Sequence, residues 1–279
     1  ESSVIFKAGG IDLLELMKEG LVNPTTIIGI KNIPGLNKIS YDDKAGLKIG
    51  ANVTLAELEN HELIKEKFYA LHLAVAHAGT PQIRNTATLG GNLAQRTRCW
   101  YFRSIEHQCY RKGSGTCYAQ EGENEFHAIM KNNSCASVHS SSVSTALMAF
   151  NAKVQITSSN CKAKEIGMEE FFVHPEVNSK NESVLGSKDL ITGIVIPPAK
   201  PGTKSYYIKQ GARESHDWAI ADVAVVTEMS GGKCKNVEIV LGAAAPVPMK
   251  AAEAAKMLLG KSIDEAIAKS AGEASMKGA

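Results

Sequence analysis

The feature that most constrains this chain is a stretch of small residues from Thr80 to Gln95, which runs directly into Cys99. At its centre the pair Gly90-Gly91 follows Thr88-Leu89, and the backbone there is not covered by side chains. Glycine can adopt positive φ and approach a ligand closely, and the N–H groups of such a turn can face an anion. A dinucleotide pyrophosphate requires this kind of surface. An ordinary tight turn has the same pattern, so the surrounding sequence must decide.

A second glycine pair lies near the start of the chain. Ser3–Ala8 has the pattern of a short buried strand, Gly9-Gly10 follows it, and Ile11–Lys18 has a helical period. A strand, a glycine turn and a helix start offer free N–H groups to a phosphate, although an ordinary connecting loop has the same form. Neither G-x-G-x-x-G nor G-x-x-x-x-G-K-[ST] occurs in the chain, so a nucleotide must be held in another way.

The remaining pattern predicts strands and helices in a mixed order. Thr54 is expected to cap a helix, with Glu57 in the capping-box position, and Ser230-Gly231-Gly232-Lys233 is expected to be a hairpin turn. The predicted strands are 25–30, 47–51, 153–156, 190–196, 204–210, 219–229 and 237–242, and the predicted helices are 55–58, 68–78, 143–150, 251–259 and 263–271. The first fifty residues therefore form a small βαβ unit, and a domain boundary is expected near 158–164.

Four of the six cysteines crowd into one loop, with the spacing C-x9-C-x7-C-x17-C; they are Cys99, Cys109, Cys117 and Cys135. Four thiolates can hold zinc or a [4Fe–4S] cluster. Structural zinc usually uses C-x2–4-C pairs, which are absent here, so the spacing favours iron–sulfur. Four unrelated thiols are the alternative. Three histidines of the loop keep a mixed-ligand site open, namely His107, His127 and His139. Cys161 and Cys234 are expected to be ordinary thiols.

Composition excludes several classes of partner. In 279 residues, 31 Lys and Arg nearly balance 29 Asp and Glu, so no extended basic surface indicates nucleic-acid binding. No stretch reaches the roughly 18 apolar residues of a membrane span, and residues 1–7 lack the pattern of a signal peptide, so a cytoplasmic location is expected. Glu1 opens almost directly onto a strand, which is compatible with a missing N-terminal segment.

Taken together, these motifs resemble the FAD-binding medium subunit of the molybdenum hydroxylase family, the xanthine dehydrogenase and carbon monoxide dehydrogenase type, over nearly the whole chain. Ala8-Gly9-Gly10-Ile11-Asp12-Leu13 is similar to the family's A-G-G-T-D-L loop, with Ile11 in place of Thr. Thr88-Leu89-Gly90-Gly91-Asn92 is similar to its T-[IL]-G-G-N loop. The segment from Lys209 to Asp217 resembles the family's K-x-x-x-R segment, with Arg213 as the arginine. The cysteine loop is similar to the [4Fe–4S] loop in the flavin subunit of 4-hydroxybenzoyl-CoA reductase.

The resemblance implies an α+β chain with the vanillyl-alcohol-oxidase (PCMH-type) FAD-binding fold in two subdomains, followed by a C-terminal domain of antiparallel strands and helices. The expected FAD-binding domain is 1–165, with subdomains of about 1–51 and 52–165 and an iron–sulfur loop of about 96–140. The C-terminal flavoprotein domain is 166–279. In the family both glycine loops wrap the FAD pyrophosphate and ribityl chain, and Lys209 and Arg213 lie near the flavin. Ser142 stands where the family usually has an Asp on the flavin side, so the site lacks that charge.

The implied function is electron transfer by FAD and a [4Fe–4S] cluster bound by Cys99, Cys109, Cys117 and Cys135. The implied partners are a molybdopterin-binding large subunit and a [2Fe–2S] small subunit, with NAD(P) or ferredoxin as an external carrier. Two other functions fit parts of the pattern. One is a zinc-stabilised, non-enzymatic interaction module, and the other is a self-sufficient NAD(P)H-dependent flavin reductase.

Overall fold

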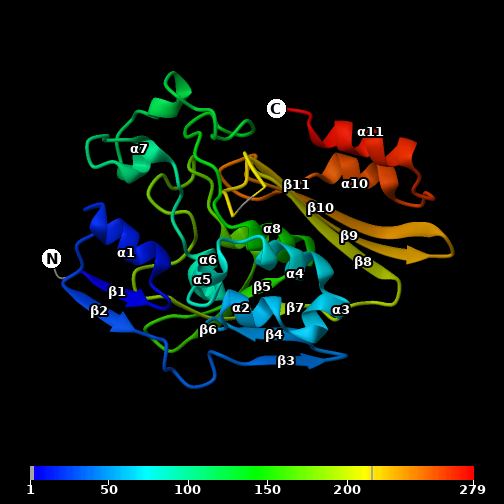
Figure 1. Ribbon diagram of the computed structural model, residues 1–279, viewed down its shortest axis with the longest axis horizontal. Helices are drawn as coiled ribbons and strands as arrows, with labels where there is room; N and C mark the ends of the chain where they lie inside the picture. The colour runs from blue at the N-terminus through cyan, green and yellow to red at the C-terminus, as the bar shows by residue number, and fades with distance from the viewer. Residues whose placement is uncertain (1–2, 215) are drawn as a thin grey trace.

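The computed structural model describes residues 3–214 and 216–279. The chain begins with a βαβ unit, as the sequence predicted. β1 (Val4–Lys7) and β2 (Thr26–Gly29) are parallel neighbours, and α1 (Ile11–Lys18) connects them. Gly10 precedes α1 with φ of 84°, a left-handed conformation that glycine adopts without strain. In Figure 1 this unit lies at one end of the molecule, beside the loop that contains α7 (Trp100–Arg103).

The centre of the molecule is a five-stranded sheet in the order β3-β4-β7-β5-β6. Every neighbouring pair in it is antiparallel. The strands are β3 (Ile39–Asp42), β4 (Gly46–Gly50), β5 (Lys153–Thr157), β6 (Ala163–Gly167) and β7 (Leu190–Ile196). β7 pairs with both β4 and β5, so the sheet draws on residues up to 196. The expected division of the chain at 165/166 stays a prediction.

Helices cover this sheet and enclose the main core (Figure 1). They are α2 (Leu55–Glu59), α3 (Glu62–Lys67), α4 (Tyr69–Ala76), α8 (Ser142–Ala149) and α9 (Met168–Phe171). The predicted capping box is confirmed, because the Thr54 hydroxyl accepts from the Glu57 N–H while the Glu57 carboxylate accepts from the Thr54 N–H. Phe68 lies between α3 and α4, is fully buried, and packs edge-on against Phe150. Neither α4 nor α8 contains Asp, Glu, Lys or Arg, which fits their largely buried positions.

The last part of the chain is a four-stranded antiparallel sheet in the order β11-β10-β9-β8, with two helices packed on it. The strands are β8 (Thr203–Gln210), β9 (Ala221–Ser230), β10 (Lys233–Gly242) and β11 (Met249–Lys250), and the helices are α10 (Ala252–Leu258) and α11 (Glu265–Ser275). The expected hairpin joins β9 to β10, with Gly231 and Gly232 both at positive φ. α8 contacts β9 and β10, and α4 contacts β8, so this sheet packs against the central helices.

Short helical turns fill the connections that surround the two glycine loops and the cysteines. They are α5 (Pro81–Arg84), α6 (Leu89–Leu93), α7, and the 3₁₀ turns η1 (Tyr110–Lys112) and η2 (Tyr118–Gln120). Over the described ranges, no helix combines the length and the apolar character that a membrane span needs.

Candidate functional site

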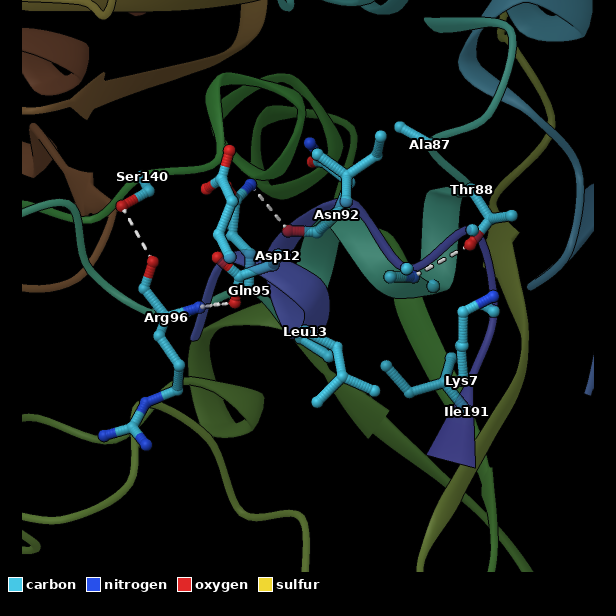
Figure 2. Close-up of a pocket in the computed structure, with 18 of the residues that line it drawn as sticks. Lys7, Asp12, Leu13, Ala87, Thr88, Asn92, Gln95, Arg96, Ser140 and Ile191 are labelled. Atoms are coloured by element: carbon cyan, nitrogen blue, oxygen red, sulfur yellow. Dashed lines mark hydrogen bonds between the residues drawn. The ribbon is translucent and has the colours of Figure 1, made fainter. Parts of the chain in front are cut away.

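A cavity of about 620 Å³ lies where the N-terminal unit, α6, the start of α8 and β8 meet. Its volume is within the range of sites that bind large organic ligands. Both glycine loops contribute to its wall (Figure 2). The predicted site residues that line it are Ala8, Gly9, Gly10, Ile11, Asp12, Leu13, Thr88, Gly90, Gly91, Asn92, Ser142 and Lys209.

The first glycine loop presents unpaired backbone donors to this cavity. The N–H groups of Ile11, Asp12 and Leu13 donate to no acceptor among the described residues. Gly9 is required by packing, since a Cβ there would lie 2.0 Å from the carbonyl oxygen of Thr86. The loop therefore brings bare backbone and the positive end of α1 to the cavity wall, an arrangement suited to a phosphate.

The second glycine loop differs from the expected turn. Gly90 and Gly91 lie inside α6 and neither has positive φ. Thr88 begins the helix, because its hydroxyl accepts the Gly91 N–H at 3.2 Å, as Figure 2 shows. Glycine is needed at Gly90 for close packing, since a Cβ there would lie 2.9 Å from the Cβ of Ala51. Gly91 leaves open space toward Ala8, whose Cβ is 4.0 Å from the position of an added Cβ.

Hydrogen bonds join the second glycine loop and the residue Arg96 that follows it to the first loop and to the start of α8. The backbone N–H of Arg96 donates to Asp12 Oδ2 at 2.9 Å, and the Arg96 carbonyl accepts from Ser140 Oγ at 3.3 Å (Figure 2). Ser141 Oγ donates to Asn92 Oδ1 at 2.5 Å. Ser140 was not predicted as a site residue, because only its contact across 44 residues places it at the cavity.

At the other side of the cavity, β8 and α8 contribute Lys209 and Ser142. Lys209 Nζ donates to the backbone carbonyls of His77 at 2.7 Å and Asp217 at 2.8 Å. Burial lowers the pKa of Lys209, while the carboxylates of Asp222 and Asp217 oppose that shift. Both predicted residues therefore reach the cavity, and a cation lies at its wall.

Two other predicted residues do not line the cavity. Leu89 is fully buried in the main core. Arg213 is largely exposed and pairs with Asp217 at 3.1 Å. Ser215, in the same segment, lies outside the described residues.

The four cysteines come together in the loop above α1. Cys99 and Cys109 pack in one small apolar cluster, and Cys117 and Cys135 form a hydrogen bond through their side chains. Burial, together with the negative charge of Cys135 and Cys109, raises the pKa of Cys99 to about 11. The interaction with the Cys117 thiol lowers the pKa of Cys135, helped by Ser137 and by the positive charge of Arg111. All four predicted ligands are thus close neighbours, although no group of three or more His, Cys, Asp or Glu side chains within 3–214 and 216–279 is arranged around a single metal ion.

Buried positive charge lies beside these thiols. The Arg111 side chain is only 3% exposed and bonds to two neutral oxygens, Ser137 Oγ and the carbonyl of Asn181, each at 3.3 Å. Lys112 Nζ donates only to backbone carbonyls, including that of His107 at 2.8 Å. In the described part of the chain, no carboxylate lies within 4 Å of either cation. A buried cation normally has an anionic partner, so this loop is suited to an anionic group held by the cysteines.

The three histidines of the loop have different surroundings. His127 Nε2 lies 3.2 Å from Cys99 Sγ, and burial lowers the pKa of His127. His107 Nδ1 lies 3.2 Å from Ser104 Oγ. His139 packs edge-on against Phe172, with ring centroids 4.3 Å apart. Of the three, only His127 has a contact with a cysteine sulfur among the described residues. Of the remaining cysteines, Cys161 is exposed and Cys234 is buried in the C-terminal core.

Comparison with known proteins defines the class of protein. Residues 1–199 match the family described as the FAD binding domain in molybdopterin dehydrogenase, and residues 206–279 match the CO dehydrogenase flavoprotein C-terminal domain. The chain therefore belongs to the FAD-binding medium subunits of the molybdenum hydroxylase family, and it is a flavoprotein oxidoreductase subunit. The family resemblance inferred from the glycine loops is confirmed.

Individual relatives agree with this family. The chain is 34% identical to the aldehyde oxidoreductase FAD-binding subunit PaoB of Escherichia coli K12, over 88% of this chain and 76% of that protein. It is 26% identical to the nicotine 6-hydroxylase medium subunit of Paenarthrobacter nicotinovorans, over 97% of this chain and 77% of that protein.

Solved structures of low sequence identity share the fold. A carbon monoxide dehydrogenase chain from Hydrogenophaga pseudoflava superposes with a TM-score of 0.74 at 23% identity, covering 98% of this chain and 78% of that one. A quinoline 2-oxidoreductase chain from Pseudomonas putida 86 superposes with a TM-score of 0.72 at 24% identity. The match covers 99% of this chain and 79% of that one. The expected PCMH-type FAD-binding fold with a C-terminal α+β domain is confirmed.

Proposed function

We propose that this chain is the electron-transfer subunit of a multi-subunit molybdenum hydroxylase-type oxidoreductase, and that it carries FAD and a [4Fe–4S] cluster. The observation that carries the proposal is the direct link between the two candidate sites. Asp12 lies in the first turn of α1 at the cavity wall, and its carboxylate binds Arg98 and Arg103, which flank Cys99. Two redox groups held on either side of this link would be near neighbours.

The cavity residues would hold and orient FAD, which supplies hydride and one-electron chemistry when bound. The free N–H groups at the start of α1 would bind the pyrophosphate. Gly90 and Gly91 would let α6 approach the nucleotide, and Thr88 holds that helix in place. Ser142 and Lys209 would face the flavin from α8 and β8. Arg213 would act from outside the wall, by holding Asp217 beside Lys209.

Cys99, Cys109, Cys117 and Cys135 would bind the cluster. Zinc bound at about 2.3 Å needs four sulfurs roughly 3.8 Å apart around one point, whereas a four-iron cube separates its ligands further. The four cysteines are neighbours in the fold, and their spacing lacks the C-x2–4-C pairs of structural zinc, which supports the larger group. The buried Arg111 would offset the negative charge of such a cluster.

The partners would be a molybdopterin-binding large subunit and a [2Fe–2S] small subunit, with NAD(P) or ferredoxin as an external carrier. Two of the relatives are named as subunits, the FAD-binding subunit of an aldehyde oxidoreductase and the medium subunit of nicotine 6-hydroxylase. The substrate would be bound by the large subunit. The cytoplasmic location expected from the sequence stays a prediction.

Cofactor analysis of anaerobically purified protein tests the proposal. We expect one FAD and four irons per chain, with visible absorption that dithionite bleaches. Cys109→Ser should lose most of the iron and keep FAD, whereas the matched variant Cys161→Ser, at an exposed thiol, should keep both. Stoichiometric zinc without iron would overturn the cluster and leave the flavin role intact. A chain that retains no FAD would overturn the proposal as a whole.

A second assay separates this function from that of a self-sufficient flavin reductase. The isolated, FAD-loaded chain should not oxidise NADH or NADPH with an artificial acceptor at an appreciable rate. Turnover without any partner subunit would favour the reductase instead.

A further inference from the structure

A buried carboxyl group lies directly behind the cavity wall where α8, β8 and β9 meet. Asp222 belongs to β9 and is 6% exposed. The strand register places it opposite Lys209 of β8 and Gly242 of β10. Asp222 itself is not part of the cavity wall, but Ser142 and Lys209 in front of it are. A charge at this position would act on whatever the cavity holds.

The polar atoms around Asp222 are not paired in the usual way. Asp222 Oδ1, Thr145 Oγ1 and the Tyr207 hydroxyl are all buried, and none forms a hydrogen bond of good geometry among the described residues, although the hydroxyls lie close enough to Asp222 to stabilise its charge. Buried polar groups are normally satisfied, and exceptions accompany catalytic roles or bound water. Glycine at position 242 lets both side chains pack directly against the backbone of β10, because a Cβ there would lie 2.1 Å from Asp222 Oδ1 and 2.3 Å from Thr145 Oγ1. These side chains therefore form a closely packed, buried polar cluster around the Asp222 carboxyl group.

The charged and titratable groups that face Asp222 come from one strand. β8 contributes Lys209 and Tyr207, α8 contributes the hydroxyls of Ser142 and Thr145, and β10 contributes a glycine. Lys209 is held by two backbone carbonyls, one of them from His77 just after α4, and it forms no ion pair with Asp222 within 4 Å. Burial raises the pKa of Asp222 to about 7, although the hydroxyls and Lys209 oppose the shift. Burial also raises the pKa of Tyr207, so its hydroxyl stays neutral.

We infer that Asp222 is a protonation site linked to reduction of the group in the cavity, with Ser142 lying between the two. This inference rests on the proposed function, in which that group is FAD. Electrons from the partner centres would add negative charge at the cavity. This charge would raise the proton affinity of the Asp222 carboxylate, which lies behind the cavity wall. One proton then moves from solvent to Asp222, where one O–H bond forms. When the electrons leave, that bond breaks and the proton returns to solvent. Asp222 thus acts through its charge on the group in the cavity, and it does not itself carry electrons.

The pH dependence of the flavin midpoint potential in the FAD-loaded chain tests this assignment. Over the range in which Asp222 titrates, the potential of the wild type should fall more steeply than that of Asp222→Asn, by about 30 mV per pH unit for a two-electron couple. Asp189→Asn is the matched control, because Asp189 also lines the cavity but is held ionised by Ser158 and the Gly186 N–H. Its slope should equal that of the wild type.

Each outcome has a defined meaning. If Asp222→Asn binds FAD and keeps the wild-type slope, the inference is wrong while the proposed function stands. If the wild type binds no FAD, both the proposed function and this inference are wrong. Should Asp222→Asn not fold, redox-difference infrared spectra of the wild type decide. A carboxylic-acid band that is gained on reduction and shifts in D₂O supports the assignment, and its absence overturns it.

Discussion

Asp12 Oδ1 lies 2.6 Å from Nη2 of Arg103, and this ion pair joins the glycine loop beneath the cavity to the first turn after Cys99. The same oxygen lies 3.0 Å from Arg98 Nη2, while Asp12 Oδ2 accepts the Arg96 N–H. An acid at the start of a helix normally competes with a bound anion. Here two arginines, which also pair with Glu15 and Glu19, offset its charge, so the free N–H groups of α1 keep their attraction for phosphate.

Asp12→Asn should destabilise the chain by about 2 kcal/mol, because two largely buried guanidinium groups lose their shared carboxylate. Denaturant unfolding of the cofactor-free chain measures the effect. Asp43→Asn is a suitable control, since the Asp43 side chain is 87% exposed and its pair with Lys67 spans 3.6 Å. That control should change stability by less than about 0.5 kcal/mol. Equal effects of the two substitutions would contradict a structural role for Asp12.

Gly91→Val should reduce FAD retention more than it reduces the stability of the cofactor-free chain. A side chain at this position points into the open space between α6 and Ala8, and the nearest atom of the fold is the Thr88 hydroxyl at 3.0 Å. Flavin content after gel filtration and the melting temperature of the cofactor-free chain separate the two effects. A fully flavinylated Gly91→Val variant would exclude contact between α6 and the cofactor.

Gly90→Ala should behave in the opposite way. The added methyl group meets Ala51, so overpacking should cost about 1–3 kcal/mol of folding stability even without cofactor. Thermal unfolding of the cofactor-free protein tests this. An unchanged melting temperature would show that α6 can move away from Ala51 without loss.

Arg111→Gln should lower the midpoint potential of the proposed cluster. A buried positive charge stabilises the more negative, reduced form, so its removal should shift the potential down by about 60 mV, which is tenfold in a one-electron equilibrium. Potentiometric titration followed by electron paramagnetic resonance measures the shift. Arg111→Lys should recover part of it, and Arg213→Gln, at an exposed site, should leave the potential unchanged. A raised potential in Arg111→Gln would contradict the proposed charge compensation.

His139 should make the fold sensitive to acid. Burial lowers the pKa of His139 to about 3, so the folded state binds this proton less readily than the unfolded state, whose pKa is 6.5. The stability that this residue contributes is complete above pH 6.5 and is lost as the pH falls toward 3, by up to roughly 5 kcal/mol. In His139→Gln the decline between these values should be smaller when unfolding is followed against pH. A decline as steep as in the wild type would assign the acid sensitivity to other groups.

Short-range interactions could be predicted from the sequence because all their atoms lie within a few residues of one another. Gly10 allows the left-handed conformation that begins α1, and the box of Thr54 and Glu57 begins α2. The hairpin at Gly231 and Gly232 depends on local backbone preference in the same way. These features, together with the two glycine motifs, were enough to predict the family and the fold.

Contacts between distant residues needed the tertiary structure. The pair Gly90-Gly91 has the composition of a turn, yet Thr88 caps it and contact with Ala51 holds it as a helix. Asp12 and Arg103 are 91 residues apart, and Asp222 lies behind the cavity wall only because β9 packs against α8. The sequence by itself determined which local elements form and which residue types can bind FAD or iron. Burial and strand pairing decided which of those residues meet, because the energy of a buried charge or close contact depends on neighbours that the local sequence does not specify.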